Sequence, residues 1–220
     1  MSGPGILRTG MAALDEFLGG SLPRGIILDA YGPGGSGKSQ LLMQAAAGAA
    51  AAGCRVAFVD TTGAFRPERV LQMSPVPGIL HNIGVLRATS VAEQVAAPAI
   101  AGDADLLILD NITDLFSYEY SGEEKAPARG REMAAHMREI ARWAIASNAG
   151  VMVANTVRRA GDGNVESMRR VVDLYTHVKL RLSGGPEYVA ECSRWDARER
   201  FGYTIHAGGL RSGPMGGDAP

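Results

Sequence analysis

The feature that most constrains the fold is a glycine-rich loop from Gly32 to Ser39, with the sequence Gly-Pro-Gly-Gly-Ser-Gly-Lys-Ser. It matches the spacing of a phosphate-binding loop, G-x-x-x-x-G-K-[ST], which joins a strand to a helix. An apolar strand is expected over residues 25–31, and a helix rich in Leu, Met, Gln and Ala over residues 39–52. A plain glycine-rich turn is the structural alternative, which the agreement of motif and flanks disfavours. The sequence therefore predicts a site for a nucleoside triphosphate.

Each residue type in this loop has a physical role in holding phosphate. Glycines let backbone N–H groups turn toward the phosphates, and the positive end of the following helix faces the same charge. Lys38 is expected to reach the β- and γ-phosphates in a catalytic role, and the Ser39 hydroxyl to complete the shell of a Mg²⁺ ion. The predicted nucleotide-binding residues of the loop are Gly32, Gly34, Gly35, Ser36, Gly37, Lys38, Ser39 and Gln40.

Composition limits the class of protein and its surroundings. The chain has 220 residues and a formal net charge of −1, so any contact with nucleic acid must come from a local patch. Cys54 and Cys192 lack metal or redox spacing, which indicates reduced thiols in a cytoplasmic protein. We expect no signal peptide and no membrane segment. One domain over residues 1–210 and a disordered Gly/Pro-rich tail over residues 211–220 are predicted.

The order of predicted elements indicates an α/β fold. A short helix capped by Thr9 is followed by strands that alternate with helices, and the continuous apolar run before Asp110 is typical of a parallel strand buried on both faces. Strands are predicted at 55–60, 83–87, 106–109, 151–155, 178–182, 188–195 and 201–206, helices at 67–73, 90–101 (broken at Pro98) and 128–148, and loops at 117–127 and 158–170. The inward face of the last helix is expected to carry Met133, Met137, Ile140, Ala144 and Ile145. We predict a mostly parallel central sheet with helices on both faces and a C-terminal antiparallel β extension formed by the last three strands.

Several segments together resemble the ATPase core of the RecA/RadA recombinases, especially the archaeal RadA and RadB branch. The resemblance extends from about residue 8 to about residue 209. The segments that carry it are residues 9–10 and 14–20, the loop at 32–40, Asp-Thr-Thr-Gly-Ala-Phe-Arg-Pro-Glu-Arg at 60–69 and Leu-Asp-Asn-Ile-Thr-Asp-Leu-Phe at 109–116. The Phe-Arg-Pro-Glu-Arg run is the specific part, because the loop alone is shared with many unrelated NTPases.

The resemblance implies a RecA-like P-loop NTPase core that binds ATP and Mg²⁺. Lys38 would hold phosphate, and Ser39 and Asp110 would hold the metal, Asp110 through water. The alternative for Asp110 is a carboxylate that caps the next turn. Arg69 would stack its guanidinium on the adenine, and its alternative is a solvated arginine on a helix.

The chain departs from this family at the residue that activates water. The family has a glutamate where this chain has Thr62, and a hydroxyl has no useful basicity near neutral pH. Loss of a positioned general base costs about 10²–10⁴-fold in rate. Asp60 lies about 6–7 Å further back on an extended strand, and Asn111 offers no carboxylate. We therefore expect slow or absent hydrolysis, so that the protein is at most a weak ATPase.

Two further departures concern DNA. The family places a glutamine that senses the γ-phosphate after Asn155, where this chain has Thr156, and its first DNA-facing loop is acidic here, over residues 121–127. The second such loop, over residues 156–170, carries Arg158, Arg159, Arg169 and Arg170. These arginines have two interpretations of equal weight. They could bind single-stranded DNA weakly and in a salt-sensitive way, or they could belong to a solvated surface loop. Strand exchange is not expected.

The first functional hypothesis is an ATP-binding paralogue of the recombinases that assists homologous recombination and DNA repair through ATP occupancy. The alternatives are an active, DNA-stimulated ATPase of the RadB type and a KaiC-like signalling ATPase or kinase, suggested by the Leu-Gly-Gly-Ser-Leu-Pro-Arg-Gly run at 18–25. Because the chain begins at the core, we expect no extended filament by the family's usual route. A homodimer or a contact with a recombinase or other protein, through aromatics such as Tyr118, Tyr120 or Trp195, remains open.

Overall fold

The computed structural model describes residues 5–160, 163–185 and 187–214, without the side chains of residues 159, 160 and 163. A ten-stranded sheet has the order β10-β9-β8-β7-β1-β5-β4-β2-β3, with β6 paired to β5 beside this path. The strands from β7 to β3 run parallel. They are β7 (Val178–Leu182), β1 (Ile27–Gly32), β5 (Gly150–Ala160), β4 (Leu106–Asp110), β2 (Val56–Asp60) and β3 (Ile83–Arg87).

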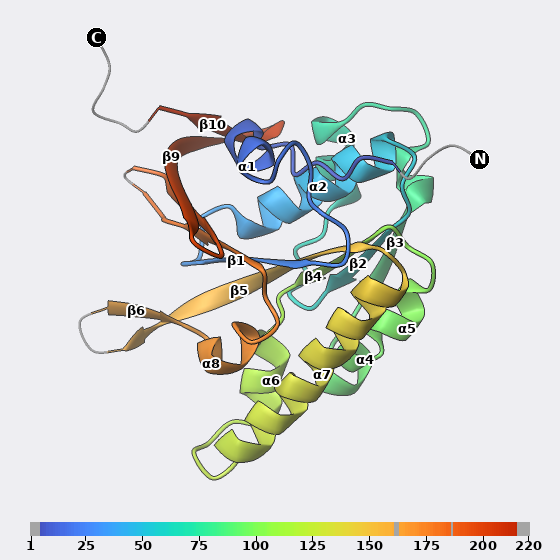
Figure 1. Cartoon of the computed structure of the whole chain (residues 1–220). Coiled ribbons are helices and arrows are strands. Elements are labelled where there is room, and N and C mark those ends of the chain that lie inside the picture. Colours follow the sequence, from blue (N-terminus) through green and yellow to red (C-terminus); the bar gives the residue numbers. More distant parts are fainter. Residues whose placement is uncertain (1–4, 161–162, 186, 215–220) are drawn as a thin grey trace.

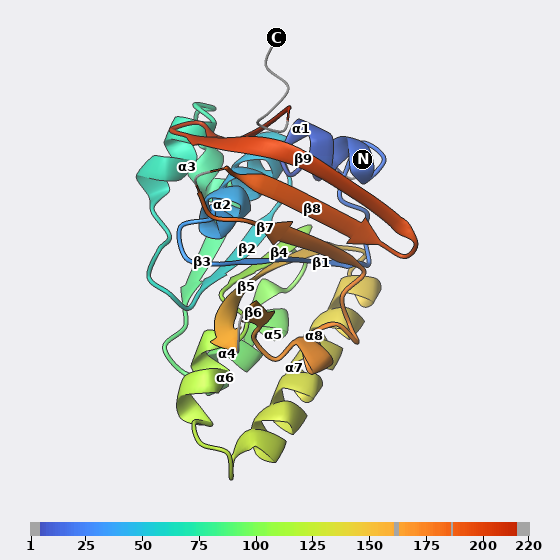
Figure 2. The ribbon, with the colours of Figure 1, turned by 90° about the vertical axis from the view of Figure 1, so that its left-hand side faces the viewer.

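Helices cover both faces of this parallel sheet (Figures 1 and 2). One face carries α1 (Ala12–Phe17), α2 (Lys38–Ala51), α3 (Pro67–Met73) and the short 3₁₀ helix η1 (Ile79–Asn82). The other face carries α4 (Val91–Val95), α5 (Ala97–Ala101), α6 (Asp114–Glu119), α7 (Ala126–Ala146) and α8 (Arg169–Val172). Each face has its own hydrophobic core, because alternate residues of a strand point to opposite sides. Leu28 and Ala30 pack into the first core and Ile27 into the second.

The strands predicted as buried on both faces are so in the structure. Every residue of β4 is buried, and β4 pairs in parallel with β2 on one side and β5 on the other. The helix over Pro67–Met73 and the strand over Ile83–Arg87 have the predicted bounds. The helix predicted over residues 90–101 is broken, but at Ala96 and not at Pro98, because a proline is tolerated in the first turn of α5. Ser90 caps α4 by accepting the N–H of Glu93.

The C-terminal part is an antiparallel extension that folds over α1 and α2 (Figure 1). Strands β8 (Val189–Arg194), β9 (Ala197–His206) and β10 (Gly209–Gly213) pair antiparallel in sequence order. The strand at residues 178–182 was predicted to belong to this extension, but β7 is parallel to β1 and antiparallel only to β8. β5 pairs with one edge of β1, and β7 pairs in parallel with the other edge. The extension is fixed to α2 by Gln44, whose amide donates to the Leu210 oxygen at 3.1 Å and accepts the Leu210 N–H at 2.6 Å.

Three other local predictions are wrong for identifiable reasons. The predicted loop over residues 158–170 contains regular structure: β5 continues to Ala160 and pairs antiparallel with β6 (Gly163–Glu166), and α8 begins at Arg169. Such a ribbon forms by backbone pairing and needs no apolar alternation. The predicted loop over residues 117–127 is shorter, because α6 extends to Glu119 and α7 begins at Ala126. Residues 211–213 of the predicted disordered tail form β10 with buried Leu210, and residues 215–220 lie outside the described part.

At the N-terminus, Thr9 does not cap α1. The residue before the helix is Met11, and Thr9 instead donates its N–H and its hydroxyl to the Asp15 carboxylate at 2.7 and 2.8 Å. The Met11 N–H donates to the Thr9 hydroxyl at 3.2 Å. A carboxylate within the helix therefore organises the turn before it. Among the described residues, no helix combines the length and the hydrophobicity needed to cross a bilayer.

The inward face of α7 contains a histidine in place of an expected isoleucine. Met133, Met137, Ile140 and Ala144 are fully buried, whereas Ile145 is 70% exposed. At 100° per residue Ile145 lies about 120° around the helix from Met133, outside the buried stripe. His136 occupies the stripe instead and stacks on Phe116, with ring centroids 5.7 Å apart.

Burial lowers the pKa of His136 to about 4. The unfolded chain, with an ordinary histidine pKa near 6.5, therefore binds more protons than the folded protein between these values. We expect the wild-type protein to lose stability as the pH falls from 6.5 to 4, by on the order of 3 kcal/mol from this group. A His136→Leu variant should lack that part of the loss. Urea unfolding across this pH range measures the difference, and equal pH dependence in both proteins would contradict it.

Candidate nucleotide-binding site

The phosphate-binding loop lies at the carboxyl end of β1 and leads directly into α2, which begins at Lys38. Gly37 has a φ of 93°, a left-handed conformation that side chains rarely adopt. A Cβ at Gly37 would also lie 3.1 Å from the Ile205 side chain of β9. The C-terminal extension therefore packs against the loop and requires a glycine there. In addition, the Tyr203 hydroxyl of β9 donates to the backbone oxygen of Ser36 at 2.7 Å, so the extension also holds the loop by a hydrogen bond.

Lys38 folds back over its own loop. Its ammonium donates to the backbone oxygens of Gly32 and Pro33, both at 2.8 Å. Burial lowers the pKa of Lys38, and the charges of Asp110 and Asp114 act in the opposite direction. The Ser36 hydroxyl is buried and has no hydrogen-bond partner among the described residues. A donor without a partner and an ammonium held only by carbonyl oxygens fit a loop that is completed by phosphate.

Asp110 ends β4 beside the loop and is 3% exposed. Burial raises the pKa of Asp110 to about 6, against a hydrogen bond from the Ser39 side chain that lowers it. A hydroxyl and a carboxylate that line the same cavity are oxygen ligands of the kind that Mg²⁺ prefers. The alternative role for Asp110, capping the next turn, belongs to Asn111, whose side-chain oxygen accepts the N–H groups of Thr113 at 2.7 Å and Asp114 at 3.3 Å. The peptide bond between Asp110 and Asn111 is cis.

These groups share one open cavity of about 450 Å³. Most of the predicted site residues line it, together with Thr62 and Thr156, the two positions where the chain departs from its predicted family. The lining residues are Gly34, Gly35, Gly37, Lys38, Ser39, Gln40, Met43, Thr62, Ala64, Asp110, Asn111, Asp114, Thr156 and Ile205. Gly32 and Ser36 lie in the same loop but do not line the cavity.

Arg69 does not line this cavity. One of its guanidinium nitrogens pairs with Gln72, and the other lies 3.4 Å from the His206 oxygen. Gln40, which does line the cavity, donates to the same oxygen at 3.0 Å. Arg69 and Gln40 are thus joined through the end of β9. This places the guanidinium beside the cavity, where contact with a base requires it to leave Gln72.

Asp60 is committed to the turn that follows β2. Its carboxylate accepts the N–H groups of residues 62–65 at 2.7 to 3.2 Å, and Arg87 lies 3.3 Å away. Burial raises the pKa of Asp60, but the hydrogen bonds from Phe65, Gly63 and Ala64 outweigh it and hold that pKa below its ordinary value. Asp60 therefore serves as a structural cap, as expected from its distance along the strand.

Asp114 is a site residue that the sequence reasoning missed. It is exposed at the start of α6, lines the cavity, and accepts a hydrogen bond from the Thr156 hydroxyl at 3.1 Å. The available signal was its position: a carboxylate four residues after Asp110 begins the helix that follows this strand end.

A second group of predicted residues lies near α7 and α8, away from the phosphate-binding loop. Arg158, Arg169 and Arg170 line one cavity of about 520 Å³ together with Arg129 of α7, which was not predicted. We call this cavity the arginine groove. The guanidinium of Arg169 pairs with Asp173 at 3.0 Å, and that of Arg129 donates to the Tyr120 oxygen at 2.9 Å. The side chain of Arg159 lies outside the described part.

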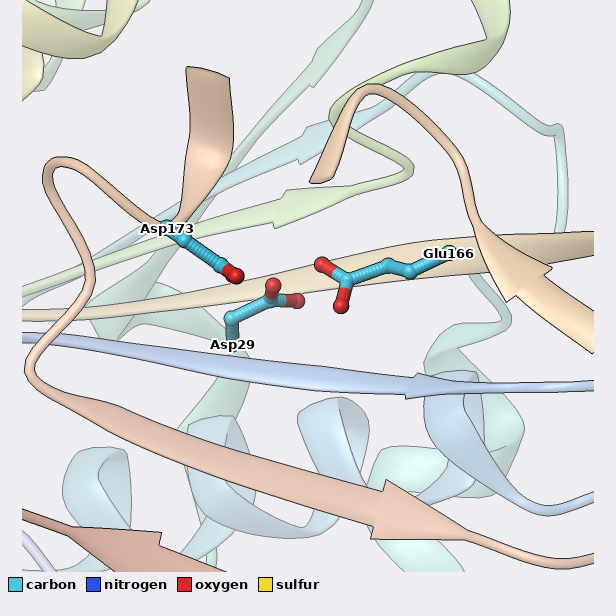
Figure 3. A group of neighbouring side chains, drawn as sticks. All are labelled: Asp29, Glu166 and Asp173. Atoms are coloured by element: carbon cyan, nitrogen blue, oxygen red, sulfur yellow. The ribbon is translucent and has the colours of Figure 1, made fainter. Parts of the chain in front are cut away.

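Next to this groove, three carboxylates converge beside β1, from which Asp29 projects (Figure 3). Asp29, Glu166 and Asp173 bring oxygen atoms within 4.8 Å of one another, a spacing that would also suit a cation. The Lys179 ammonium contacts all three, at 2.6 Å to Asp29, 2.8 Å to Asp173 and in a close contact with Glu166. Burial lowers the pKa of Lys179, but Asp29 and Glu166 outweigh it and raise the pKa above its ordinary value. The cluster therefore carries its own cation.

Replacing Lys179 with Met should destabilise the protein, because Asp29 and Glu166 are buried and would lose their counter-charge. A loss of about 3 kcal/mol in the free energy of unfolding is expected. The same change at the exposed Lys125 is the control and should have little effect. Urea unfolding at neutral pH measures both, and an unchanged Lys179→Met stability would show that the cluster is satisfied without the ammonium.

Comparison with known proteins identifies the family of the chain. Residues 6–173 match the family described as Rad51. The chain is similar to the DNA repair and recombination protein RadA of Methanoculleus marisnigri, 33% identical over an alignment 223 residues long that covers 84% of this chain and 67% of the relative. It is also similar to the proteins of the same name from Ignicoccus hospitalis and Metallosphaera sedula, both 30% identical, over 71% of this chain and 54% of each relative. The chain spans about half the length of these two relatives.

A parallel sheet whose first strand ends in a phosphate-binding loop, facing an acidic strand end, defines a P-loop NTPase core of the RecA type. The Rad51 match covers well over half of the chain and includes β1, the phosphate-binding loop and β4. The chain therefore belongs to the Rad51 family and has a RecA/RadA-type recombinase core.

Proposed function

We propose that this protein is an ATP-binding paralogue of the RadA recombinases that assists recombinational DNA repair, with slow ATP hydrolysis. The observation that carries the proposal is the composition of one cavity, in which the phosphate-binding residues meet Thr62 instead of a glutamate. The printed names of the relatives supply the setting of DNA repair and recombination.

The binding half of the site would use the loop as it stands. The N–H groups of Gly34, Gly35 and Gly37 and the Lys38 ammonium would hold the phosphates. Ser39 and Asp110 would hold Mg²⁺, which neutralises phosphate charge when it is bound. The Arg69 guanidinium would exchange Gln72 for the face of the adenine. Lys38 makes the largest electrostatic contribution, because its ammonium is already partly desolvated.

The hydrolytic half is weaker. Thr62 lines the cavity, but its hydroxyl donates to Asp60 at 3.1 Å and has no basicity with which to take a proton from water. Four backbone N–H groups of the turn after β2 donate to the Asp60 carboxylate and hold it within that turn. We infer that nucleotide occupancy, more than turnover, sets the state of the protein.

A second candidate, a DNA-stimulated ATPase of the RadB type, is favoured by one observation. Asp114 brings a carboxylate into the cavity at a position where the sequence reasoning foresaw none. If DNA binding near Thr156 aligned this carboxylate, turnover would rise in the presence of DNA. Comparison of the hydrolysis rate with and without single-stranded DNA separates the two candidates.

The proposal predicts that the protein binds ATP with Mg²⁺ and hydrolyses it slowly, and that Thr62→Glu raises the rate. About tenfold or more is expected, because the new carboxylate restores a base where the family has one. Thr62→Gln, which has the same shape without the charge, is the matched control. Isothermal titration measures binding, and phosphate release measures turnover. Absence of ATP binding would refute the proposal, and equal rates for the Glu and Gln variants would refute the explanation of slow turnover.

We further propose that the arginine groove binds single-stranded DNA weakly. The groove is formed by the β5–β6 ribbon, α8 and the start of α7, and β5 connects it directly to Thr156 at the nucleotide cavity. Arg158 and Arg170 are exposed and have no side-chain partner among the described residues, whereas Arg169 pairs with Asp173. Arginine suits phosphate because its fork of N–H groups matches two oxygens.

The double variant Arg158→Ala/Arg170→Ala should weaken binding to oligo-dT. It should also flatten the slope of log Kobs against log salt concentration by about 1.4, the expected release of counterions for two phosphate contacts. Arg138→Ala, on the exposed side of α7 outside the groove, should leave both unchanged. Fluorescence anisotropy at several salt concentrations measures the slope. Equal slopes for the wild-type protein and the double variant would place DNA elsewhere.

The proposed partner is a recombinase or a second copy of this chain, in the cytoplasm. Of the aromatic residues considered for such a contact, Tyr118 is 81% and Trp195 75% exposed. Tyr120 instead stacks on Phe116 and packs into the core. Cys54 and Cys192 are both buried and free, in keeping with a reducing compartment.

A further inference from the structure

The nucleotide cavity contains a carboxylate that neither the loop nor the capping turn uses. Among the described residues that line the cavity, the carboxylates are Asp110 and Asp114. Asp110 is buried, lines the cavity together with Ser39 and is suited to the metal. Asp114 is exposed to the cavity, and its charge acts on both Lys38 and Asp110. Asp114 thus places a negative charge near the Lys38 ammonium, which would hold the terminal phosphates. Neither the proposed phosphate site nor the proposed metal site accounts for this charge.

The orientation of Asp114 is fixed from two sides. Its backbone N–H donates to the side chain of Asn111 at 3.3 Å, which sets the first turn of α6. The Thr156 hydroxyl donates to Oδ1 at 3.1 Å, and the other oxygen, Oδ2, has no hydrogen-bond partner among the described residues. Thr156 follows Asn155 at the point where β5 leaves the sheet, so its position is set by the pairing of Asn155 with Tyr31 and of Thr156 with Gly32. The carboxylate is thus oriented, with one acceptor oxygen left for water.

We propose that Asp114 binds and deprotonates the water that attacks the γ-phosphate, and that Thr156 is its positioning residue. This inference rests on the proposed binding of ATP. The water oxygen forms a bond to the γ-phosphorus while the bond from that phosphorus to the β–γ bridging oxygen breaks. The water proton passes to Asp114, the products are ADP and inorganic phosphate, and the exposed carboxylate then releases the proton to solvent.

The proposal explains why both departures from the family occur in the same cavity. Thr62 removes a base from the β2 side, and Asp114 brings one from the β4 side. Thr156, shorter than the glutamine expected there, donates its hydroxyl to Asp114.

The decisive experiment compares Asp114→Asn with the wild-type protein in single-turnover hydrolysis of radiolabelled ATP, and measures affinity for ATP and ADP with Mg²⁺ by isothermal titration. We expect Asp114→Asn to bind ATP at least as tightly, because a negative charge near the phosphates is removed, and to hydrolyse it at least about tenfold more slowly. Asp114→Ala should behave in the same way. Glu132→Gln, an exposed charge loss on α7 away from this cavity, is the control and should match the wild type.

Thr156 is tested by its conservative and non-conservative variants. Thr156→Val should slow turnover with unchanged ATP affinity, whereas Thr156→Ser, which keeps the hydroxyl, should restore most of the rate. Equal hydrolysis by the wild-type protein and Asp114→Asn, including no turnover in either, overturns the inference while ATP binding stands. Tighter ATP binding by Asp114→Asn at an unchanged rate also overturns it and makes Asp114 a discriminator against ATP. Absence of ATP binding by the wild-type protein removes the proposed function itself.

Discussion

Parallel pairing is the constraint on which the site depends. Because β1, β2, β4 and β5 run in the same direction, their carboxyl ends meet at one edge of the sheet, and each contributes one part of the cavity. The register is close: Gly32 of the loop lies opposite Thr156, and Asp60 opposite Asp110. Sites at this edge are a general property of open α/β sheets. A shift of one residue in any of these pairings would turn the chemical groups to the opposite face.

Behind that edge, buried polar groups form a continuous chain of hydrogen bonds. Thr113 donates to the Asn155 side chain at 2.8 Å, and Asn155 donates to Glu166 at 3.0 Å. Glu166 in turn contacts Lys179, which also contacts Asp29 of β1 and Asp173 beyond α8. The strand ends and the β5–β6 ribbon are therefore held in a fixed relation by polar contacts that would be costly to leave unpaired. This chain of contacts joins the cavity wall to the arginine groove without an apolar interruption.

The sequence allowed most of the parallel sheet and the phosphate-binding loop to be predicted, because both depend on local patterns. The structure of a continuous apolar run, such as residues 106–109, or of a motif, such as Gly32 to Ser39, can be predicted without knowledge of the rest of the chain. What could not be predicted depends on partners far along the chain. The pairing of β7 with β1, the ribbon formed by β5 and β6, and β10 against β9 all arise from contacts between segments. Asp114 and Arg129 were missed for the same reason, since their importance comes from Thr156 and from Arg158 and Arg170.

The two hydrogen bonds between the Gln44 amide and the backbone of Leu210 have a consequence for the chain's C-terminal end. They attach β10 to α2, the helix that starts at the phosphate-binding Lys38. Cleavage of the chain shortly before Leu210 would release β10, leave the buried Gln44 amide without partners and expose the apolar side of α2. The integrity of the nucleotide pocket would then depend on a peptide bond more than a hundred residues away in sequence, so limited proteolysis at this end would be felt at the phosphate loop.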